Sequence, residues 1–295
     1  MTRRPLHATA LAAILLTLIP LSLSAQRMTR RVFIRATDAA GEPVLDLTAA
    51  DLRVTENGNP REVTRLALGK APMRIVLLVD SSAAMSSMIN NFRAGLDTFI
   101  DTLPAEHEIT FISTGGQIRV RSQPSADRLK LKTETARFAS DSGANAFLDT
   151  LIEADKRFLK TAPGQWPVFV IVTTDNGESR SDLRLDEFNK FVTDFMARGG
   201  SAHGVIVVGR QAGAVTDLVL NFVENSGGIH GSINTANSLP DKLKAIAERL
   251  GFDHQVMADR YEVDFTGDAR LQQPFVNIGV TREGVRVEMS ARRPF

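Results

Sequence analysis

The sequence predicts an α/β protein with a doubly wound, mostly parallel sheet and, beside it, a small β unit formed by the two flanks of the chain. Between residues 75 and 254, apolar runs without alternation are separated by stretches with helical periodicity. Such runs are typical of parallel strands buried on both faces. On either side of this region, apolar and polar residues alternate, which indicates antiparallel strands with one exposed face.

The central region alternates strands with helices. Because a crossover between parallel strands is almost always right-handed, this alternation leaves few topologies for the sheet. The expected strands are 75–79, 109–112, 168–172 and 205–208, and the expected helices are 87–103, 126–139, 145–159, 182–198, 214–225 and 239–254.

The two flanks consist of short strand-like segments. Before the central region, Asn57-Gly58 is a strong signal for a tight turn between strands. Neither flank has enough strands to be stable alone, and the ends of a compact domain usually lie close together. We therefore expect the flanks to pair as one β unit, with the α/β domain inserted between them. After the central region, the expected strands are 261–265, 276–280 and 285–289.

Composition restricts the class of function. Of the 295 residues, 43% are hydrophobic, which suffices for a full domain and a smaller companion. The 35 Lys and Arg residues nearly balance the 34 Asp and Glu residues, without a long block of one sign. Nucleic-acid binding therefore has no support. The chain has no cysteine and hence no disulfide bonds.

The first 25 residues have the features of a secretory signal peptide. Arg3 and Arg4 precede an apolar run at 6–23, and small residues end at Ala25. Cleavage after Ala25, or after Ser24, would give an exported periplasmic or extracellular protein. The alternative is an uncleaved membrane anchor, since the run approaches the length of a membrane span. The expected segments are a signal peptide at 1–25, β segments at 26–70 and 256–295, and the α/β domain at 71–255.

Oxygen-bearing side chains follow two of the expected central strands. Asp80 and Ser82 come directly after the first strand, and Asp175 follows the strand that begins near Val168. Ligands of open parallel sheets bind beyond the carboxyl ends of the strands, where these loops converge. We therefore expect the binding face at this edge of the sheet.

These loops resemble the von Willebrand factor type A family, in which Asp-x-Ser-x-Ser, a threonine on a second loop and an aspartate on a third form a metal-ion-dependent adhesion site. Asp80 and Ser82 match the first two positions, and Ala84 stands at the third. Asn145 occupies the place of the threonine, and Asp175 matches the third loop. The resemblance covers residues 72–250, and the flanks resemble a bacterial, exported subgroup of such proteins.

The resemblance implies a protein-binding module, not an enzyme, in which an acidic side chain of the partner completes the coordination of a divalent cation. Mg²⁺ prefers six oxygen ligands and keeps several waters. Asp80, Ser82 and a water-bridged Asp175 could therefore hold Mg²⁺, Mn²⁺ or Ca²⁺, with the Asn145 amide oxygen as a further ligand. Ala84 supplies no ligand, so we expect weaker binding than at a complete site.

Three alternatives remain open. The first is a metal-independent scaffold that uses the same face or an edge strand of the β unit. The second is a hydrolase with Ser82 or Ser86 as nucleophile, although no base stands beside either in the sequence. The third is a purely structural role, in which Asp80 and Ser82 cap the next helix and Asp175 belongs to a turn.

Other residues offer weaker signals. The five histidines have no metal-binding spacing. Trp166 is expected to pack at the start of its strand. Arg292 and Arg293 are expected to be exposed to solvent.

Overall fold

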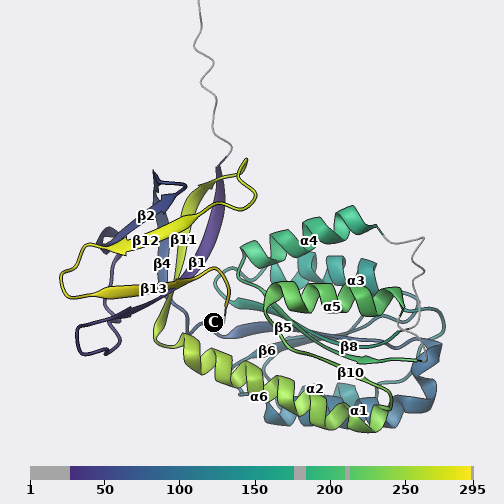
Figure 1. Cartoon of the computed structure of the whole chain (residues 1–295). Coiled ribbons are helices and arrows are strands. Elements are labelled where there is room, and N and C mark those ends of the chain that lie inside the picture. Colours follow the sequence, from purple (N-terminus) through teal and green to yellow (C-terminus); the bar gives the residue numbers. More distant parts are fainter. Residues whose placement is uncertain (1–26, 176–183, 210–212, 294–295) are drawn as a thin grey trace, which may run out of the picture.

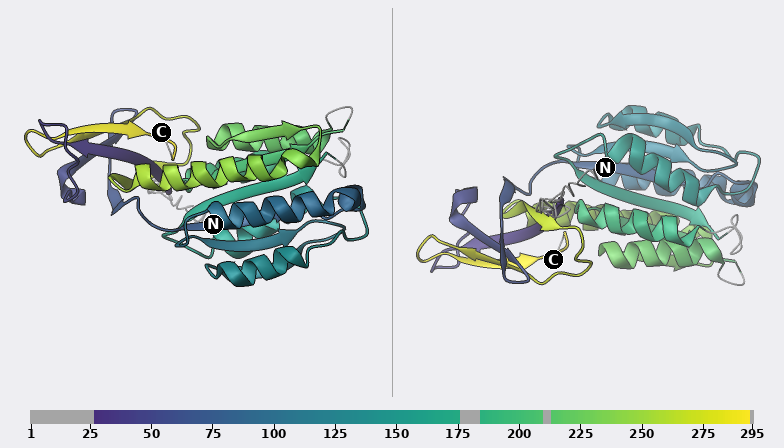
Figure 2. Two further views of the ribbon diagram at one scale, coloured as in Figure 1. Left: turned by 90° about the horizontal axis from the view of Figure 1, so that it is seen from below. Right: turned by 90° about the horizontal axis from the view of Figure 1, so that it is seen from above.

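The computed structural model describes residues 27–175, 184–209 and 213–293, and the structural statements below concern these residues. The expected signal peptide lies outside them. No helix within the described ranges is both long and apolar enough to span a membrane. The chain forms an α/β unit, from β5 to α6, and a smaller β unit beside one end of it (Figures 1 and 2).

The α/β unit is built on a six-stranded sheet in the order β10-β9-β8-β5-β6-β7. Its first five strands in this order are parallel, and β7 pairs with β6 in the antiparallel direction. The strands are β5 (Met73–Val79), β6 (Glu108–Ser113), β7 (Arg119–Ser125), β8 (Trp166–Thr174), β9 (Ser201–Val207) and β10 (His230–Ile233).

Helices cover both faces of this sheet (Figure 1). Alternate residues of β5 belong to different cores: Ile75 and Leu77 pack with α1 and α6, whereas Val76 and Leu78 pack with α3, α4 and α5. This confirms the predicted doubly wound class. The helices are α1 (Ile89–Thr102), α2 (Arg128–Ala136), α3 (Phe147–Ala154), α4 (Leu185–Ala197), α5 (Ala214–Ser226) and α6 (Leu239–Met257).

Some expected boundaries differ from those observed. The helix expected at 87–103 is preceded by a 3-10 segment, Ala83–Met88. The one expected at 145–159 ends as α-helix at Ala154 and continues as a π-helical turn, Asp155–Leu159. For the helix expected at 182–198, residues 182 and 183 lie outside the described ranges.

The β unit contains two antiparallel sheets, in the orders β13-β1-β11-β4 and β12-β2-β3. They enclose a separate core that includes Ile34, Val54 and Val263. Both flanks contribute, as the fold class predicted. The strands are β1 (Arg27–Thr37), β2 (Leu52–Glu56), β3 (Asn59–Arg61), β4 (Val63–Leu68), β11 (Arg260–Asp268), β12 (Val276–Val280) and β13 (Arg286–Ser290).

The α/β unit is inserted between β4 and β11, which pair directly with each other. The two segments that connect the units therefore lie close together. Strands β1 and β13 also pair, with Phe33 opposite Ser290 and Thr37 opposite Arg286. The domain bounds expected at residues 70 and 255 stay a prediction.

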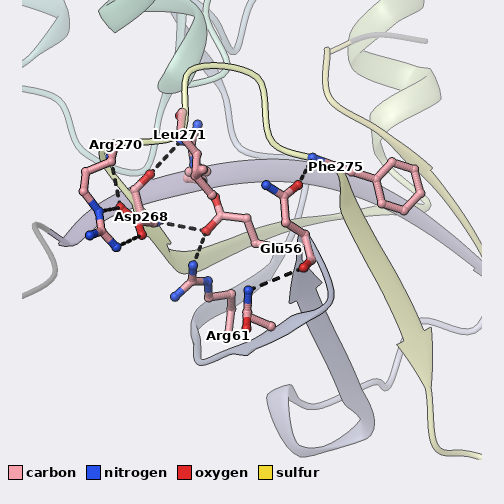
Figure 3. A network of polar contacts seen from close by, with 9 residues as sticks. Glu56, Arg61, Asp268, Arg270, Leu271 and Phe275 are labelled. Carbon is pink, nitrogen blue, oxygen red and sulfur yellow. Dashed lines mark hydrogen bonds and ion pairs between the residues drawn. The ribbon is translucent and has the colours of Figure 1, made fainter.

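A polar network around Glu56 fastens the loops of the β unit (Figure 3). The Glu56 carboxylate is fully buried and accepts a hydrogen bond from the Asp268 backbone N–H at 2.9 Å. It also forms ion pairs at 2.7 Å with Arg30 and with Arg61. Asn57 follows in a left-handed conformation, with φ of 50°, which confirms the turn predicted at Asn57-Gly58.

Arg293 corrects the expectation of an exposed basic tail. Its side chain is fully buried, whereas that of Arg292 is exposed. The Arg293 guanidinium lies over the rings of Trp166, at 4.5 Å from the centroid, and Phe33, at 4.9 Å, and it is ion-paired with Glu262. Trp166 is buried at the start of β8, as expected. The segment after β13 therefore joins the two units.

Candidate functional site

The expected site residues lie on loops at the carboxyl edge of the central sheet. Asp80 directly follows β5, Thr114 follows β6 and Asp175 follows β8, and these three strands are neighbours. Because Arg293 contacts Trp166 at the opposite end of β8, the β unit lies away from this edge. The β unit therefore does not cover this edge.

The Asp80 carboxylate is buried, with 1% of the residue exposed. Its Oδ1 accepts a hydrogen bond from Ser82 N at 2.7 Å, and its Oδ2 accepts one from Thr174 N at 3.1 Å. The Thr174 hydroxyl also donates to Oδ2. No basic side chain of the described residues forms an ion pair with Asp80. A buried charge of this kind is normally paired or bound to a metal.

Ser82 lies beside Asp80 and is 2% exposed. Its Oγ has no hydrogen-bond partner among the described residues. A buried hydroxyl without a partner costs about 1–3 kcal/mol, so this oxygen is poised for a ligand. Ala84 is exposed and offers only a methyl group, as the sequence implied.

Asn145 is buried and connects the loop after β6 with the end of β8. Its Oδ1 accepts a hydrogen bond from the Thr114 hydroxyl, and its Nδ2 donates to Thr173 Oγ1 at 2.9 Å. Thr173 Oγ1 in turn donates to the Thr174 carbonyl at 2.9 Å. Asn145 therefore already acts as a bridge between loops, and one lone pair of its amide oxygen remains available.

Asp175 binds the first turn of α5. Its Oδ1 accepts a hydrogen bond from Thr216 N at 3.0 Å, and its Oδ2 accepts one from Gly213 N. A carboxylate at this position satisfies free N–H groups and interacts favourably with the helix dipole. Its predicted contact with a cation through water stays a prediction.

A second polar cluster, which the sequence did not reveal, supports the Asp80 loop. Ser81 Oγ donates to Asp141 Oδ2 at 2.7 Å and accepts from Gly115 N at 2.8 Å. Arg121 also donates to Asp141, at 2.6 Å. A Cβ on Gly115 would lie 2.7 Å from the Ser81 carbonyl oxygen, so this close approach requires glycine. No sequence motif joins these four residues.

The donor set fits a hard cation at Asp80 and Ser82. A carboxylate offers about four lone-pair positions, and three protein donors bind that of Asp80. The Ser82 hydroxyl would be the second oxygen ligand, because no described protein group competes for it. Mg²⁺ usually binds one or two carboxylates and retains several waters. One carboxylate and one hydroxyl are therefore enough protein ligands.

The structure also brings together Glu106, His107 and His254, whose ligand atoms lie within 4.8 Å of one another. His107 precedes β6, at the opposite edge of the sheet. Its Nδ1 accepts a hydrogen bond from Met73 N at 3.3 Å, which places the proton on Nε2. Burial, and next the charge of His254, lowers the pKa of His107 to about 4. Because neither nitrogen offers a free lone pair, we interpret His107 as structural.

Comparisons with known proteins support the fold. No protein-family profile matches the sequence, and no curated protein matches it. Among solved structures, a von Willebrand factor type A protein from Catenulispora acidiphila superposes with a TM-score of 0.53 at 11% identity, over 89% of this chain and 73% of that one. Proximal thread matrix protein 1 from the mussel byssus gives 0.50 at 10% identity, over 61% and 48%. The chain therefore has the von Willebrand factor type A fold.

Proposed function

We propose that this protein is an exported interaction module, not an enzyme, that binds a protein partner through a divalent cation at the carboxyl edge of its central sheet. One observation carries the proposal: the buried Asp80 carboxylate, without a basic partner among the described residues, accepts a hydrogen bond from the backbone of Ser82, whose buried hydroxyl lacks a hydrogen-bond partner there. A cation satisfies both groups at once. Mg²⁺ and Mn²⁺ suit these oxygen ligands, and Ca²⁺ is a weaker candidate for so small a set.

The bound cation supplies positive charge at the edge of the sheet, to which an acidic side chain of a partner can bind. Asn145 and Asp175 hold the adjoining loops in place and would contact the cation directly or through water. Export rests on the signal-like residues 1–25.

A groove beside this site offers further contact area to the partner. It has a volume of about 450 Å³ and is lined by Ala146, next to Asn145, and by Asp149, Glu153 and Glu187. Arg184 forms ion pairs with Asp149 and Glu187, so the described residues of the groove keep a net negative charge. A partner with a basic side chain close to its acidic one would match both features.

A specific observation favours a metal-independent variant of this function. The Thr174 hydroxyl donates to Asp80, the Thr114 hydroxyl donates to Asn145, and α5 binds Asp175. Hydrogen-bond donors of the protein therefore already satisfy part of the acceptor capacity of these side chains. In this second candidate, a partner binds the same face by direct hydrogen bonds.

Calorimetric titration with Mn²⁺ and Mg²⁺ tests the cation. We expect saturable binding to the wild type, weaker binding to Ser82→Ala, and none to Asp80→Ala. Asp241→Asn, which removes an exposed carboxylate on α6, serves as a matched control and should bind as the wild type does. Absence of heat and of a thermal shift in the wild type would refute the cation.

Co-purification from an envelope fraction, with and without EDTA, separates the two candidates. Loss of the captured protein in EDTA supports the cation-dependent site. Capture that survives EDTA but is lost in Asp80→Ala supports the metal-independent face. Capture unaffected by either change would refute this edge as the binding surface.

A further inference from the structure

The β unit and its junction with the α/β unit contain ion-pair clusters with more positive than negative charge. Three buried carboxylates, Glu56, Glu262 and Asp264, are exposed by 0%, 3% and 9% of their side chains. Within the described residues, five arginines share them. Glu56 pairs with Arg30 and Arg61, Glu262 with Arg31, Arg65 and Arg293, and Asp264 with Arg31 and Arg65.

Among the described residues, these five arginines outnumber the three carboxylates that they share by two, in a partly buried region. Burial, and next the charges of Arg31 and Arg65, lowers the pKa of Arg293 well below its usual value. Partly buried charges of one sign repel each other strongly, because the local dielectric constant is below that of water. An additional anion at the junction would therefore be stabilising.

A groove at this junction is accessible to such an anion. It has a volume of about 380 Å³ and lies between β1, the loop after β11, the C-terminal half of α4 and the segment after β13. Small-molecule sites often occur at such junctions, with volumes of about 300–1,000 Å³. Arg30, Arg31 and Arg292 provide its charge, and Met196, Pro274 and Val276 provide apolar surface.

Arg292 is the arginine best placed to bind the anion. Arg30 and Arg31 are committed to carboxylates, and Arg31 also donates to the Arg198 carbonyl at the end of α4. The Arg292 side chain makes no hydrogen bond or ion pair with the described residues. Its backbone is fixed, since its N–H donates to Ser290 Oγ at 3.1 Å and its carbonyl accepts from that hydroxyl at 2.9 Å. Arg293, buried next to it, anchors the same segment.

We propose that this groove binds a small amphipathic anion, namely a medium-chain fatty carboxylate. The carboxylate binds Arg292, and the chain covers the apolar surface of Met196, Pro274 and Val276. A small inorganic anion would pair with the positive charge but leave that apolar surface exposed to water. An uncharged hydrocarbon would leave the excess positive charge in place. The combination of the two features selects an anion with an apolar body.

Binding of decanoate to the full chain, measured calorimetrically below its micellar concentration, tests the proposal. Two ligands dissect it: acetate has the charge without the chain, and decyltrimethylammonium has the chain with the opposite charge. Arg292→Glu replaces the positive charge that binds the carboxylate by a negative one. Met196→Glu places a negative charge on the apolar surface that the hydrocarbon chain covers. Arg137→Ala, which removes a 72% exposed arginine directly after α2, is the matched control.

We expect decanoate to bind the wild type and the Arg137→Ala control equally, and to bind Arg292→Glu and Met196→Glu at least about tenfold more weakly, a change worth about 1.4 kcal/mol. Acetate and decyltrimethylammonium should give no saturable binding. Circular dichroism verifies that each variant is folded. The proposal is overturned if decanoate does not bind, if Arg292→Glu binds it as the control does, or if the cationic amphiphile binds equally well.

Discussion

Replacement of Arg293 by alanine should loosen the contact between the two units. The change removes the contacts of the guanidinium with Phe33 and Trp166 and its ion pair with Glu262. Desolvated cation–π contacts contribute about 2 kcal/mol, and breaking a buried ion pair costs about 3–5 kcal/mol when a charge is left alone. Glu262 keeps Arg65 and Arg31 as partners. Their presence and the relief of repulsion reduce the cost, so we expect a loss of about 2–3 kcal/mol.

The chain contains a single tryptophan, which makes this prediction simple to measure. Urea unfolding of Arg293→Ala, followed by Trp166 fluorescence and by circular dichroism, should give a lower midpoint than the wild type. The native emission of Trp166 should shift to the red, because its ring gains contact with water. Arg293→Lys should be intermediate, since an ammonium group does not stack as a planar guanidinium does. Arg292→Ala is the control, with a change within about 0.5 kcal/mol. Equal midpoints and native spectra for Arg293→Ala and the wild type would refute the reasoning.

Three further predictions concern pH, the Asp80 loop and processing. The pKa of His107 is about 4 in the folded chain against an ordinary value of 6.5, so the unfolded state binds more protons between these values. Stability should therefore decrease as pH falls from about 6.5 to about 4, and less steeply in His107→Gln; equal slopes in urea midpoints would contradict this. Gly115→Ala should weaken Mn²⁺ binding without removing a ligand, because its Cβ would collide with Ser81; unchanged calorimetric affinity would show that the loop tolerates the shift. Mass spectrometry of the exported protein should find Gln26 as the first residue, whereas an intact N-terminus would indicate an uncleaved anchor.

The sequence predicted the central strands, whose two faces are both buried. The run at 75–79 is apolar at every position because both faces of β5 are covered. The edge strands β7 and β10 were missed, since Arg119–Ser125 is largely polar and His230–Ile233 contains glycine and only four residues. Neither pattern differs from that of a loop.

For the candidate site, order along the chain predicted which loops converge but not what their side chains bind. Asp80 and Ser82 follow β5 as expected, whereas the capping of α5 by Asp175 and the link from Asp141 to Ser81 depend on three-dimensional contacts. The same holds for Arg293, since a basic pair after a strand gives no sign of the aromatic rings that it contacts. Sequence spacing carries no information about residues that meet only after folding.

The pairing of β1 with β13 determines how tension along the chain would act on the protein. Because the strands are antiparallel and Phe33 lies opposite Ser290, the N-terminal end of β1 and the C-terminal end of β13 point toward the same end of the sheet. A pull on both would open this ladder one residue pair at a time, which needs less force than shearing all pairs together. The α/β unit departs from β4 and returns to β11, so the load would reach it through the contact of Arg293 with Trp166. Once that contact breaks, we expect Asp80 and its loops to keep their arrangement while the β unit yields.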